Sequence, residues 1–499
     1  MQGGRILYKR GYGMADLDHD VSIGPDSVFH VASLSKQFTA TAIVLLAQDR
    51  GLSLDDDVRK YLPELPDFGT PITIRHLIHH TSGLRDQWDL LQLAGWRYSL
   101  DLITDDDVLE LFSRQRDLNF KPGEQFLYSN TGYTLLAQIV QRVSRQSFRD
   151  FTERRIFEPL GMTNTHFRDD HAEIVKRQAI GYAKSGNVFR LSIPNFDTVG
   201  PTGLMTTVED LALWDENFYQ PTADWKSVVE QLLQTGTLNN GQPLTYAFGL
   251  QLQKYRGLPV VDHNGADAGY KADLLRFPEQ HFSVACLCNV SEANPALLAR
   301  FVADVFLASE FKEPQPSAIP VETPVTLSQR QLSPYIGLYW DQETESAFRL
   351  TLSEGRLMLG SNAMIPVADN RFLVGALEVT AEPATAEVPL RLIVKSGREA
   401  RAQIFTAAPE VRMTPAQRGE YAGNYQSDEI DGLYRIVDER NSLVLKRPKY
   451  GTDLLTPTIL DYFRGGPGSL HFLRNASGEI TGFLMRTGRI RNFQFKRVD

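Results

Sequence analysis

A serine and a lysine three residues apart, Ser33 and Lys36, stand near the start of the sequence. The residues from Gln37 to Asp49 repeat apolar side chains with the period of a helix, which places Ser33 at the opening of that helix. Positions three apart share one helix face, so the amine can reach the hydroxyl. A lysine with a lowered pKa can accept a serine proton, and helix N-termini favour negative charge. The pattern predicts a serine nucleophile, although a helix-capping serine beside a solvated lysine fits the same letters.

A second stretch carries polar side chains that suit the same chemistry. Tyr128 and Asn130 lie between the turn at 121–124 and a helix expected over residues 133–143. Tyr128 could act as a base or proton shuttle if a lysine lowers its pKa, and Asn130 could hold a substrate amide or steady the lysine. The other interpretation makes Tyr128 a core side chain and Asn130 a helix cap.

Two clusters suggest a metal, but neither has the spacing of metal ligands. The three aspartates at 55–57 lack the later glycine and glutamate of a calcium loop, and a capped helix start explains them. The three histidines at 76, 79 and 80 lie in a short helix expected within residues 73–84, without the glutamate of an H-E-x-x-H motif. We expect these histidines to cap the helix end, and we expect no metal and no cofactor.

The elements around these residues predict an α+β domain. Strands are expected over residues 5–13, 272–277 and 282–288, and a helix over 295–307, which is typical of an antiparallel sheet packed by terminal helices. A glycine-rich loop over 200–206 precedes a further helix and lets backbone approach a ligand closely. The two cysteines, Cys286 and Cys288, would share one face of a strand and are poorly placed to bridge each other. They are expected to be buried core thiols.

The chain of 499 residues is long enough for two to four domains. Its composition, 42% hydrophobic and 23% charged, is that of a globular protein, and no apolar run reaches the roughly 18 residues of a membrane span. A net charge of −9 without a basic stripe argues against nucleic-acid binding. The first residues lack the organisation of a signal peptide, so the sequence as written predicts a cytoplasmic protein.

A domain boundary follows the expected terminal helix. Four prolines within residues 313–327 predict a semi-rigid linker, and the chain beyond it consists of short alternating strands. The pattern Tyr-x-Gly-x-Tyr at 335–339 returns 86 residues later at 421–425. Tandem copies of one small β-barrel are therefore expected. The predicted organisation is a first domain over 1–312, this linker, and β-barrel domains over 328–412 and 413–499.

Three motifs in the first domain resemble those of the penicillin-recognising serine hydrolases, the group of class C β-lactamases, DD-peptidases, related esterases and D-aminopeptidases. The motifs are Ser33-x-x-Lys36, Tyr128-x-Asn130 and His263-Asn264-Gly265. Residues 77–84, 158–162 and 274–278 resemble the same family, and the resemblance covers residues 5–310. It implies a β-lactamase/transpeptidase-like fold, an antiparallel sheet with helices.

The resemblance also implies roles for single residues. Ser33 would attack a carbonyl, Lys36 and Tyr128 would manage its proton, and Asn130 would orient the substrate and the lysine. The backbone N–H groups of Ser33 and Ala266 would form the oxyanion hole.

The third motif would lie beside the substrate, with Asn264 and Gly265 as substrate-binding residues. Its His263 stands where many relatives carry lysine. We expect this histidine to titrate near neutrality and to change the pH dependence.

The C-terminal barrels and the His-x-Gly motif look most like the three-domain D-aminopeptidases, which remove an N-terminal D-residue from small peptides. In those relatives a C-terminal element helps to close the site, and the candidate here is the loop 461–468, where Asp461 could receive a substrate ammonium. Such relatives usually begin with a helix and a strand before the equivalent of residues 5–13. A start further upstream would change the expected location to the periplasm or the exterior.

The substrate is expected to be a small peptide, amide or ester. An esterase or β-lactamase of the same family, or a peptide-cyclising acyl transferase, shares the chemistry and differs in the pocket or the acceptor. An alternative from another class is a catalytically silent protein that binds peptidoglycan fragments. The oligomeric state stays open, with a dimer among the options.

Overall fold

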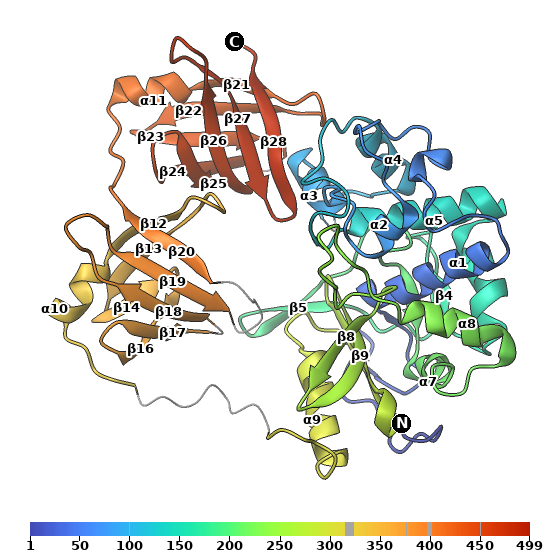
Figure 1. The fold of residues 1–499 in the computed structure, drawn as a ribbon. Coiled ribbons are helices and arrows are strands. Elements are labelled where there is room, and N and C mark those ends of the chain that lie inside the picture. The colour runs from blue at the N-terminus through green and yellow to red at the C-terminus, as the bar shows by residue number, and fades with distance from the viewer. Residues whose placement is uncertain (99, 315–323, 376, 397–401, 450) are drawn as a thin grey trace. The chain divides into compact units, whose positions relative to one another are not determined.

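The computed structural model describes residues 1–499 except 99, 315–323, 376, 397–401 and 450 (Figure 1). The chain forms two compact units. The first unit comprises residues 1–314 and 489–491, and the second comprises residues 315–488 and 492–499. Most of the linker expected over 313–327 lies outside the described residues.

A four-stranded antiparallel sheet in the order β11-β10-β9-β8 forms one side of the first unit. Its strands are β8 (Gln251–Tyr255), β9 (Leu258–Asp267), β10 (Tyr270–Phe277) and β11 (Phe282–Cys288). Helix α9 (Pro295–Phe306) packs on one face, where its Ala299 and Ala303 meet apolar side chains of the strands. The strands and helix expected near the end of the first domain are therefore present. The two cysteines are free and only half-buried, which corrects the expectation of core thiols, because β11 lies at the sheet edge.

Helices α1 (Lys36–Gln48) and α5 (Asn130–Ser144) lie side by side in the helical part of the first unit (Figure 1). Every residue of α1 from Lys36 to Leu46 is buried, including its polar ones. A helix enclosed on all sides needs partners for each polar group, and this requirement places several buried hydrogen bonds around Lys36.

The nucleophile candidate lies in a single 3-10 turn, η1 (Ala32–Ser35), directly before α1. Strand β3 (Phe29–His30) leads into this turn and pairs with β7 (Leu204–Thr206), which pairs in turn with β4 (His166–Phe167). This small sheet fixes the direction from which the chain enters the turn.

The remaining regular elements of the first unit are short. They are β1 (Met14–Asp16), β2 (Val21–Ser22), η2 (Val58–Lys60), α2 (Ile74–Ile78), α3 (Gln87–Leu93), α4 (Asp105–Ser113), α6 (Phe148–Thr152), η3 (Glu153–Phe157), β5 (Tyr182–Ser185), β6 (Val188–Leu191), α7 (Val208–Glu216), α8 (Ala223–Leu232) and η4 (Pro278–Gln280). Helix α2 is shorter than the stretch 73–84 in which a helix was expected, and it begins with a capping box at Thr73.

The strand expected over residues 5–13 is absent. These residues form no ladder, and the pairings nearby are isolated bridges of Gln2 with Arg5 and with Phe282. Ile6, Leu7 and Tyr8 are exposed. The alternating sequence suits a strand, and β11 has an outer edge free of any paired strand among the described residues, but the chain meets this edge only at Met1 and Gln2. Residues 6–12 line a cavity together with β11 and make no ladder to it.

The second unit contains two antiparallel β-structures. The first is a nine-stranded sheet with the order β15-β14-β13-β12-β20-β19-β18-β17-β16, and the second is a closed barrel of β21–β28. The sheet's strands are β12 (Gly337–Asp341), β13 (Ser346–Ser353), β14 (Arg356–Leu359), β15 (Asn362–Ala363), β16 (Ile365–Ala368), β17 (Arg371–Val374), β18 (Leu377–Glu382), β19 (Arg391–Ser396) and β20 (Gln403–Ala408), after α10 (Gln329–Leu332) and η5 (Ser333–Tyr335). The barrel has α11 (Pro415–Tyr421), β21 (Gly423–Gln426), β22 (Leu433–Glu439), β23 (Ser442–Arg447), β24 (Gly451–Pro457), β25 (Tyr462–Gly465), β26 (Gly468–Arg474), β27 (Ile480–Thr487) and β28 (Ile490–Arg497).

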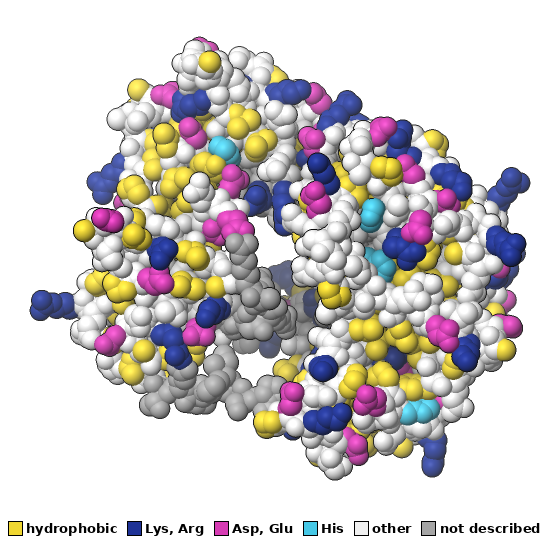
Figure 2. Space-filling model, in the orientation of Figure 1, with side chains coloured by type: hydrophobic (Ala, Val, Ile, Leu, Met, Phe, Trp, Pro, Cys, Tyr) yellow, Lys and Arg dark blue, Asp and Glu magenta, His cyan; other side chains and the backbone are white. Residues whose placement is uncertain are grey.

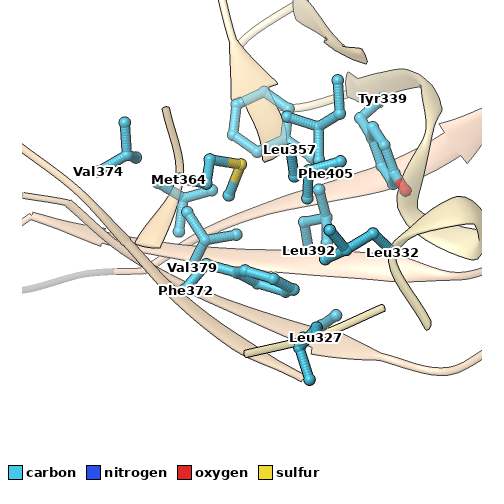
Figure 3. Packing of buried hydrophobic residues seen from close by; sticks show 13 residues of the cluster. Leu327, Leu332, Tyr339, Leu357, Met364, Phe372, Val374, Val379, Leu392 and Phe405 are labelled. Carbon is cyan, nitrogen blue, oxygen red and sulfur yellow. The ribbon is translucent and has the colours of Figure 1, made fainter. Parts of the chain in front are cut away.

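Side chains of the nine-stranded sheet converge on an apolar core (Figure 3). Leu327 and Leu332 enter this core from outside the sheet, beside Phe372, Leu392 and Phe405 of the strands. The curled sheet thus encloses its own core, as expected for a barrel-like domain.

The two copies of the sequence repeat also share a hydrogen bond in the structure. The Tyr339 hydroxyl donates to the Tyr335 carbonyl at 2.8 Å, and the Tyr425 hydroxyl donates to the Tyr421 carbonyl at 2.8 Å. The two copies differ in closure: the second closes because β21 pairs with β28, whereas β15 and β16 end the first sheet without pairing to each other.

Among the described residues, no helix is both long and apolar enough to cross a membrane. On the face that Figure 2 shows, basic and acidic side chains alternate over the surface, and no broad basic area is visible.

Candidate active site

Lys36 is fully buried at the start of α1, and its side chain reaches three oxygen atoms. The distances from Lys36 Nζ are 3.1 Å to Ser33 Oγ, 2.9 Å to Asn130 Oδ1 and 2.8 Å to the Pro201 carbonyl oxygen. Burial, the largest effect, holds the pKa of Lys36 well below its usual range; carboxylates of Asp86 and Asp267 act in the opposite direction. The amine is therefore predominantly neutral at a lower pH than a solvated lysine would be.

A neutral amine has two hydrogens and one lone pair, and the three contacts of Lys36 fit this count. The amide oxygen of Asn130 and the carbonyl of Pro201 can only accept, so they take the two hydrogens. Ser33 Oγ is the only partner of the three that carries a hydrogen of its own. In the neutral form of Lys36 the lone pair is therefore left for the Ser33 hydroxyl, as a general base requires.

Asn130 is held on its other side by a buried carboxylate. The backbone N–H and the Nδ2 of Asn130 donate to Asp86 Oδ2 at 2.8 and 3.0 Å, while Asp86 Oδ1 accepts from the Trp88 N–H at 3.0 Å and so caps α3. Both polar ends of the Asn130 amide are thereby occupied. The contact with Lys36 fits the steadying role that the sequence suggested for Asn130.

Tyr128 lies against Ser33 and Lys36. Its hydroxyl interacts with the Ser33 side chain, and Lys36 Nζ lies 4.8 Å from the centroid of its ring. Burial raises the pKa of Tyr128 above its usual value, with the Ser33 hydrogen bond acting weakly in the other direction. The phenol therefore stays protonated, which corrects the expectation of a lysine-lowered pKa and suits a proton relay better than a phenolate base.

The His80 ring packs against the ring of Tyr128. The two rings lie with centroids 4.2 Å apart, and His80 Nδ1 accepts from the Ser129 N–H at 3.2 Å. Burial keeps the pKa of His80 well below its usual value. His80 is thus a neutral packing partner of the loop that carries Tyr128.

His263 is fully enclosed and differs from the sequence-based expectation. Its Nδ1 lies 2.7 Å from the Asn264 carbonyl and its Nε2 lies 3.0 Å from the Tyr246 hydroxyl. A carbonyl only accepts, so Nδ1 carries the hydrogen and Nε2 accepts from Tyr246. Burial, together with Lys36, lowers the pKa of His263 to about 3. The ring is neutral near pH 7, so the expected titration near neutrality is wrong.

The third motif brings backbone close to the nucleophile turn. Strand β8 pairs with β9 only from Leu258 to Asp262, so the segment 263–267 has an edge without a ladder partner among the described residues. A Cβ at Gly265 would lie 2.1 Å from the Val31 carbonyl oxygen, which shows how closely β9 passes the turn. This approach places Ala266 beside the segment that contains Ser33. Because side chains alternate along a strand, the Asn264 side chain lies on the face opposite to that of His263, where it is exposed.

Asp461 and Arg489 lie far along the sequence from the other candidate residues and belong to different units. Asp461 lies in the second unit, where its carboxylate accepts from the Tyr421 hydroxyl at 2.8 Å and from Arg474 at 2.8–3.0 Å. Its oxygens are thus already engaged by a cation and a phenol. Arg489 belongs to the first unit, donates to Asp86 Oδ2 at 3.0 Å and lies 5.1 Å from the centre of the Tyr128 ring.

Several site residues were not foreseen from the sequence. Asp86 follows the family-like stretch 77–84 by two positions. An acid before a helix predicts a helix cap, and Asp86 does cap α3, but the sequence does not predict its hydrogen bonds to Asn130. Tyr246 and Pro201 carry no local signal, because a tyrosine hydroxyl and a backbone carbonyl gain their roles only from tertiary contacts.

The comparisons with known proteins agree with this geometry. The β-lactamase family model matches residues 1–307. Penicillin-binding protein 4* of Bacillus subtilis is 31% identical over 406 residues, which cover 76% of this chain and 88% of that protein. A D-aminopeptidase of Gluconobacter oxydans is 27% identical over 521 aligned positions, which cover 100% of this chain and 94% of that protein.

A similar fold is found in a solved structure, an octameric penicillin-binding protein homologue from Pyrococcus abyssi. Its TM-score is 0.57 at 22% identity, with 91% of this chain and 94% of that chain covered. The family model covers more than half of the sequence, and the serine–lysine site lies within the matched residues. The chain belongs to the β-lactamase family, a family of serine hydrolases.

Proposed function

We propose that this protein is a serine amidase or peptidase that acts through an acyl-enzyme at Ser33 on small peptides with a D-residue at the N-terminus. The observation that carries the chemistry is the contact set of Lys36, whose Nζ lies within 3.1 Å of Ser33 Oγ, Asn130 Oδ1 and the Pro201 carbonyl oxygen. When the amine is neutral, its two hydrogens go to the two obligate acceptors and its lone pair is left for Ser33 Oγ. The substrate class is supported by the D-aminopeptidase relative, because that similarity extends over the whole chain, including the second unit.

In the proposed reaction Lys36 Nζ accepts the hydroxyl proton of Ser33 while Oγ attacks the substrate carbonyl carbon. The oxyanion of the tetrahedral intermediate is held by the backbone N–H groups of Ser33 and Ala266. The proton then passes to the leaving amine, with the neutral Tyr128 hydroxyl as the relay between Ser33 and the leaving group. The C–N bond breaks and an ester to Ser33 remains.

Water hydrolyses this ester in the second half of the reaction. Lys36 again accepts a proton, now from the water, and the Ser33 oxygen leaves with a proton as the acid product departs. No charged histidine takes part, since His263 is neutral in this mechanism. The pH dependence should therefore follow Lys36.

A second candidate function is penicillin binding, which the relative named penicillin-binding protein 4* favours. A β-lactam would acylate Ser33 by the same attack, with the ring amide nitrogen as leaving group that stays attached. The two candidates differ in what is turned over rather than in the nucleophile.

One substrate panel tests both candidates. D- and L-alanine p-nitroanilide, p-nitrophenyl acetate and a chromogenic cephalosporin should be compared on wild type, Ser33→Ala and Lys36→Ala. We expect turnover of the D-alanine anilide above that of the L-isomer, loss of all turnover in both variants, and a mass increase on Ser33 when the reaction is quenched early. Equal rates on both anilides would refute the D-aminopeptidase proposal, and acylation that survives Ser33→Ala would refute the nucleophile.

A further inference from the structure

Three buried polar side chains from separate parts of the first unit meet beside the candidate site. His30 Nε2, Thr202 Oγ1 and Asp267 Oδ2 form a triangle in which each pair of atoms is 3.1 Å apart. His30 and Thr202 are each 5% exposed, and the Asp267 side chain is 10% exposed. The Thr202 hydroxyl donates its one hydrogen to the Asp267 carboxylate, so the His30 Nε2–H is shared between the two oxygens.

Each member of this triangle is attached to a different part of the site. His30 ends β3, directly before the turn that contains Ser33. Thr202 follows Pro201, whose carbonyl accepts from Lys36. Asp267 ends β9, directly after Ala266. The triangle therefore joins the nucleophile turn, the loop that binds the lysine and the strand proposed to supply an oxyanion donor.

The backbone at two of these junctions is in the left-handed region. Ala32 has φ 48° and Ala268 has φ 45°, although both carry a Cβ. A non-glycine residue is strained in this region and persists only where its surroundings hold it. The segments that need holding are those that the His30–Thr202–Asp267 triangle connects.

We propose that His30, Thr202 and Asp267 are positioning residues that hold these three segments in register for acylation of Ser33. None of the three contacts the Ser33 hydroxyl, so their effect passes through the backbone and through Lys36. The proposal rests on Ser33 and Lys36 acting as nucleophile and base, as proposed above.

Asp267 has an electrostatic effect as well. The charged groups that affect Lys36 are Asp86, Asp267 and Arg489. The titratable side chains of Tyr128, His80 and His263 also lie around it, and all three are neutral near pH 7. Loss of the Asp267 charge removes one of two carboxylates that favour the ammonium form. The pKa of Lys36 should then fall further.

Two substitutions at Asp267 separate these effects. Asp267→Asn keeps an acceptor oxygen for Thr202 and His30 but removes the charge, so we expect the acid limb of the pH profile to move to lower pH with a small change in kcat. Asp267→Ala removes the acceptor, and misplacement of the reacting groups should lower kcat for acylation about 10- to 100-fold with KM within about threefold. Thr202→Val should behave like Asp267→Ala, and Thr202→Ser should restore activity.

The assay is acylation of Ser33 by p-nitrophenyl acetate and by a fluorophosphonate probe, followed over pH. Asp262→Asn is the matched control, because Asp262 is a buried carboxylate of the same strand that pairs with Arg300 at 2.7 Å away from the nucleophile turn. This variant should lower the unfolding temperature without moving the acid limb.

Wild-type activity with Thr202→Val and Asp267→Ala would overturn the positioning proposal, and an unmoved acid limb in Asp267→Asn would overturn the electrostatic effect of Asp267 on Lys36. If Asp267→Ala does not fold, the comparison of Thr202→Val with Thr202→Ser decides the question. Wild-type protein that neither reagent acylates would instead refute the nucleophile assignment, so the two failures are distinguishable.

Discussion

Asp86→Asn should change the pH dependence of activity more clearly than it changes the fold. Asp86 is fully buried and accepts from Asn130, Trp88 and Arg489. Asparagine has one acceptor oxygen, so either orientation of the new amide sets an NH2 group against a backbone N–H, that of Trp88 or that of Asn130. A buried donor without an acceptor costs about 1–3 kcal/mol, and the free energy of unfolding should fall by about that amount.

The effect on activity follows from charge. Activity needs neutral Lys36, so it rises as pH increases through the pKa of Lys36. The Asp86 carboxylate favours the ammonium form, and its removal lowers that pKa. The acid limb of kcat/KM should therefore move to lower pH, while kcat on the plateau falls about tenfold, the equivalent of about 1.4 kcal/mol, because Asn130 is held less firmly.

The matched control is Asp210→Asn. Asp210 is also a buried carboxylate, and it accepts from the backbone N–H and Nδ2 of a single asparagine, Asn164, at 2.7 and 3.3 Å, and from the Thr165 hydroxyl at 2.7 Å. It should lose similar stability in urea denaturation, with an unchanged pH profile of p-nitrophenyl acetate hydrolysis. An unmoved acid limb in Asp86→Asn, or an equal shift in Asp210→Asn, would refute the electrostatic coupling to Lys36.

Three further substitutions test other parts of the structure. Tyr246→Phe removes the donor to His263 and leaves a buried acceptor unpaired, so stability should fall by about 1–3 kcal/mol in urea denaturation with the pH profile of activity unchanged. Gly265→Ala would set a Cβ 2.1 Å from the Val31 carbonyl oxygen and push β9 from the nucleophile turn; kcat/KM should fall about 100-fold while circular dichroism stays close to that of wild type. Arg276→Leu removes the partner of the buried Asp215 carboxylate, which accepts from Arg276 Nε at 2.7 Å in the wild type. Urea denaturation should show a loss of about 3–5 kcal/mol in the free energy of unfolding.

The parts of the site that the sequence predicts are those set by local spacing. Ser33 and Lys36 are three residues apart at a helix start, and that spacing alone brings their side chains together. Asn130 opens α5, as its place before an amphipathic stretch indicates. The pKa directions of Tyr128 and His263 differ from those that the sequence suggested, because they depend on burial that the local sequence does not encode.

The fold is also harder to predict where it depends on which strands, distant in the sequence, pair with each other. Alternation and glycine turns predict the strands of the second unit, and the repeat predicts their duplication. Closure depends on whether the first and last strands meet, and this happens for β21 and β28 but not for β15 and β16. Residues 5–13 show the converse, since a pattern typical of a strand forms no ladder here although, among the described residues, the outer edge of β11 is free of a paired strand.

The charges around Lys36 explain why a neutral histidine fits the third motif. Burial already lowers the pKa of Lys36, and Arg489 lowers it further, whereas Asp86 and Asp267 raise it. A lysine in place of His263 would add a second cation to the same enclosed space, and among the described residues the carboxylates that affect this space are those that already act on Lys36. The Tyr246 hydroxyl and the Asn264 carbonyl satisfy both nitrogens of a neutral ring instead. Two carboxylates thus oppose the lowering of the Lys36 pKa by burial, and the neutral histidine adds hydrogen bonds to the site without adding charge.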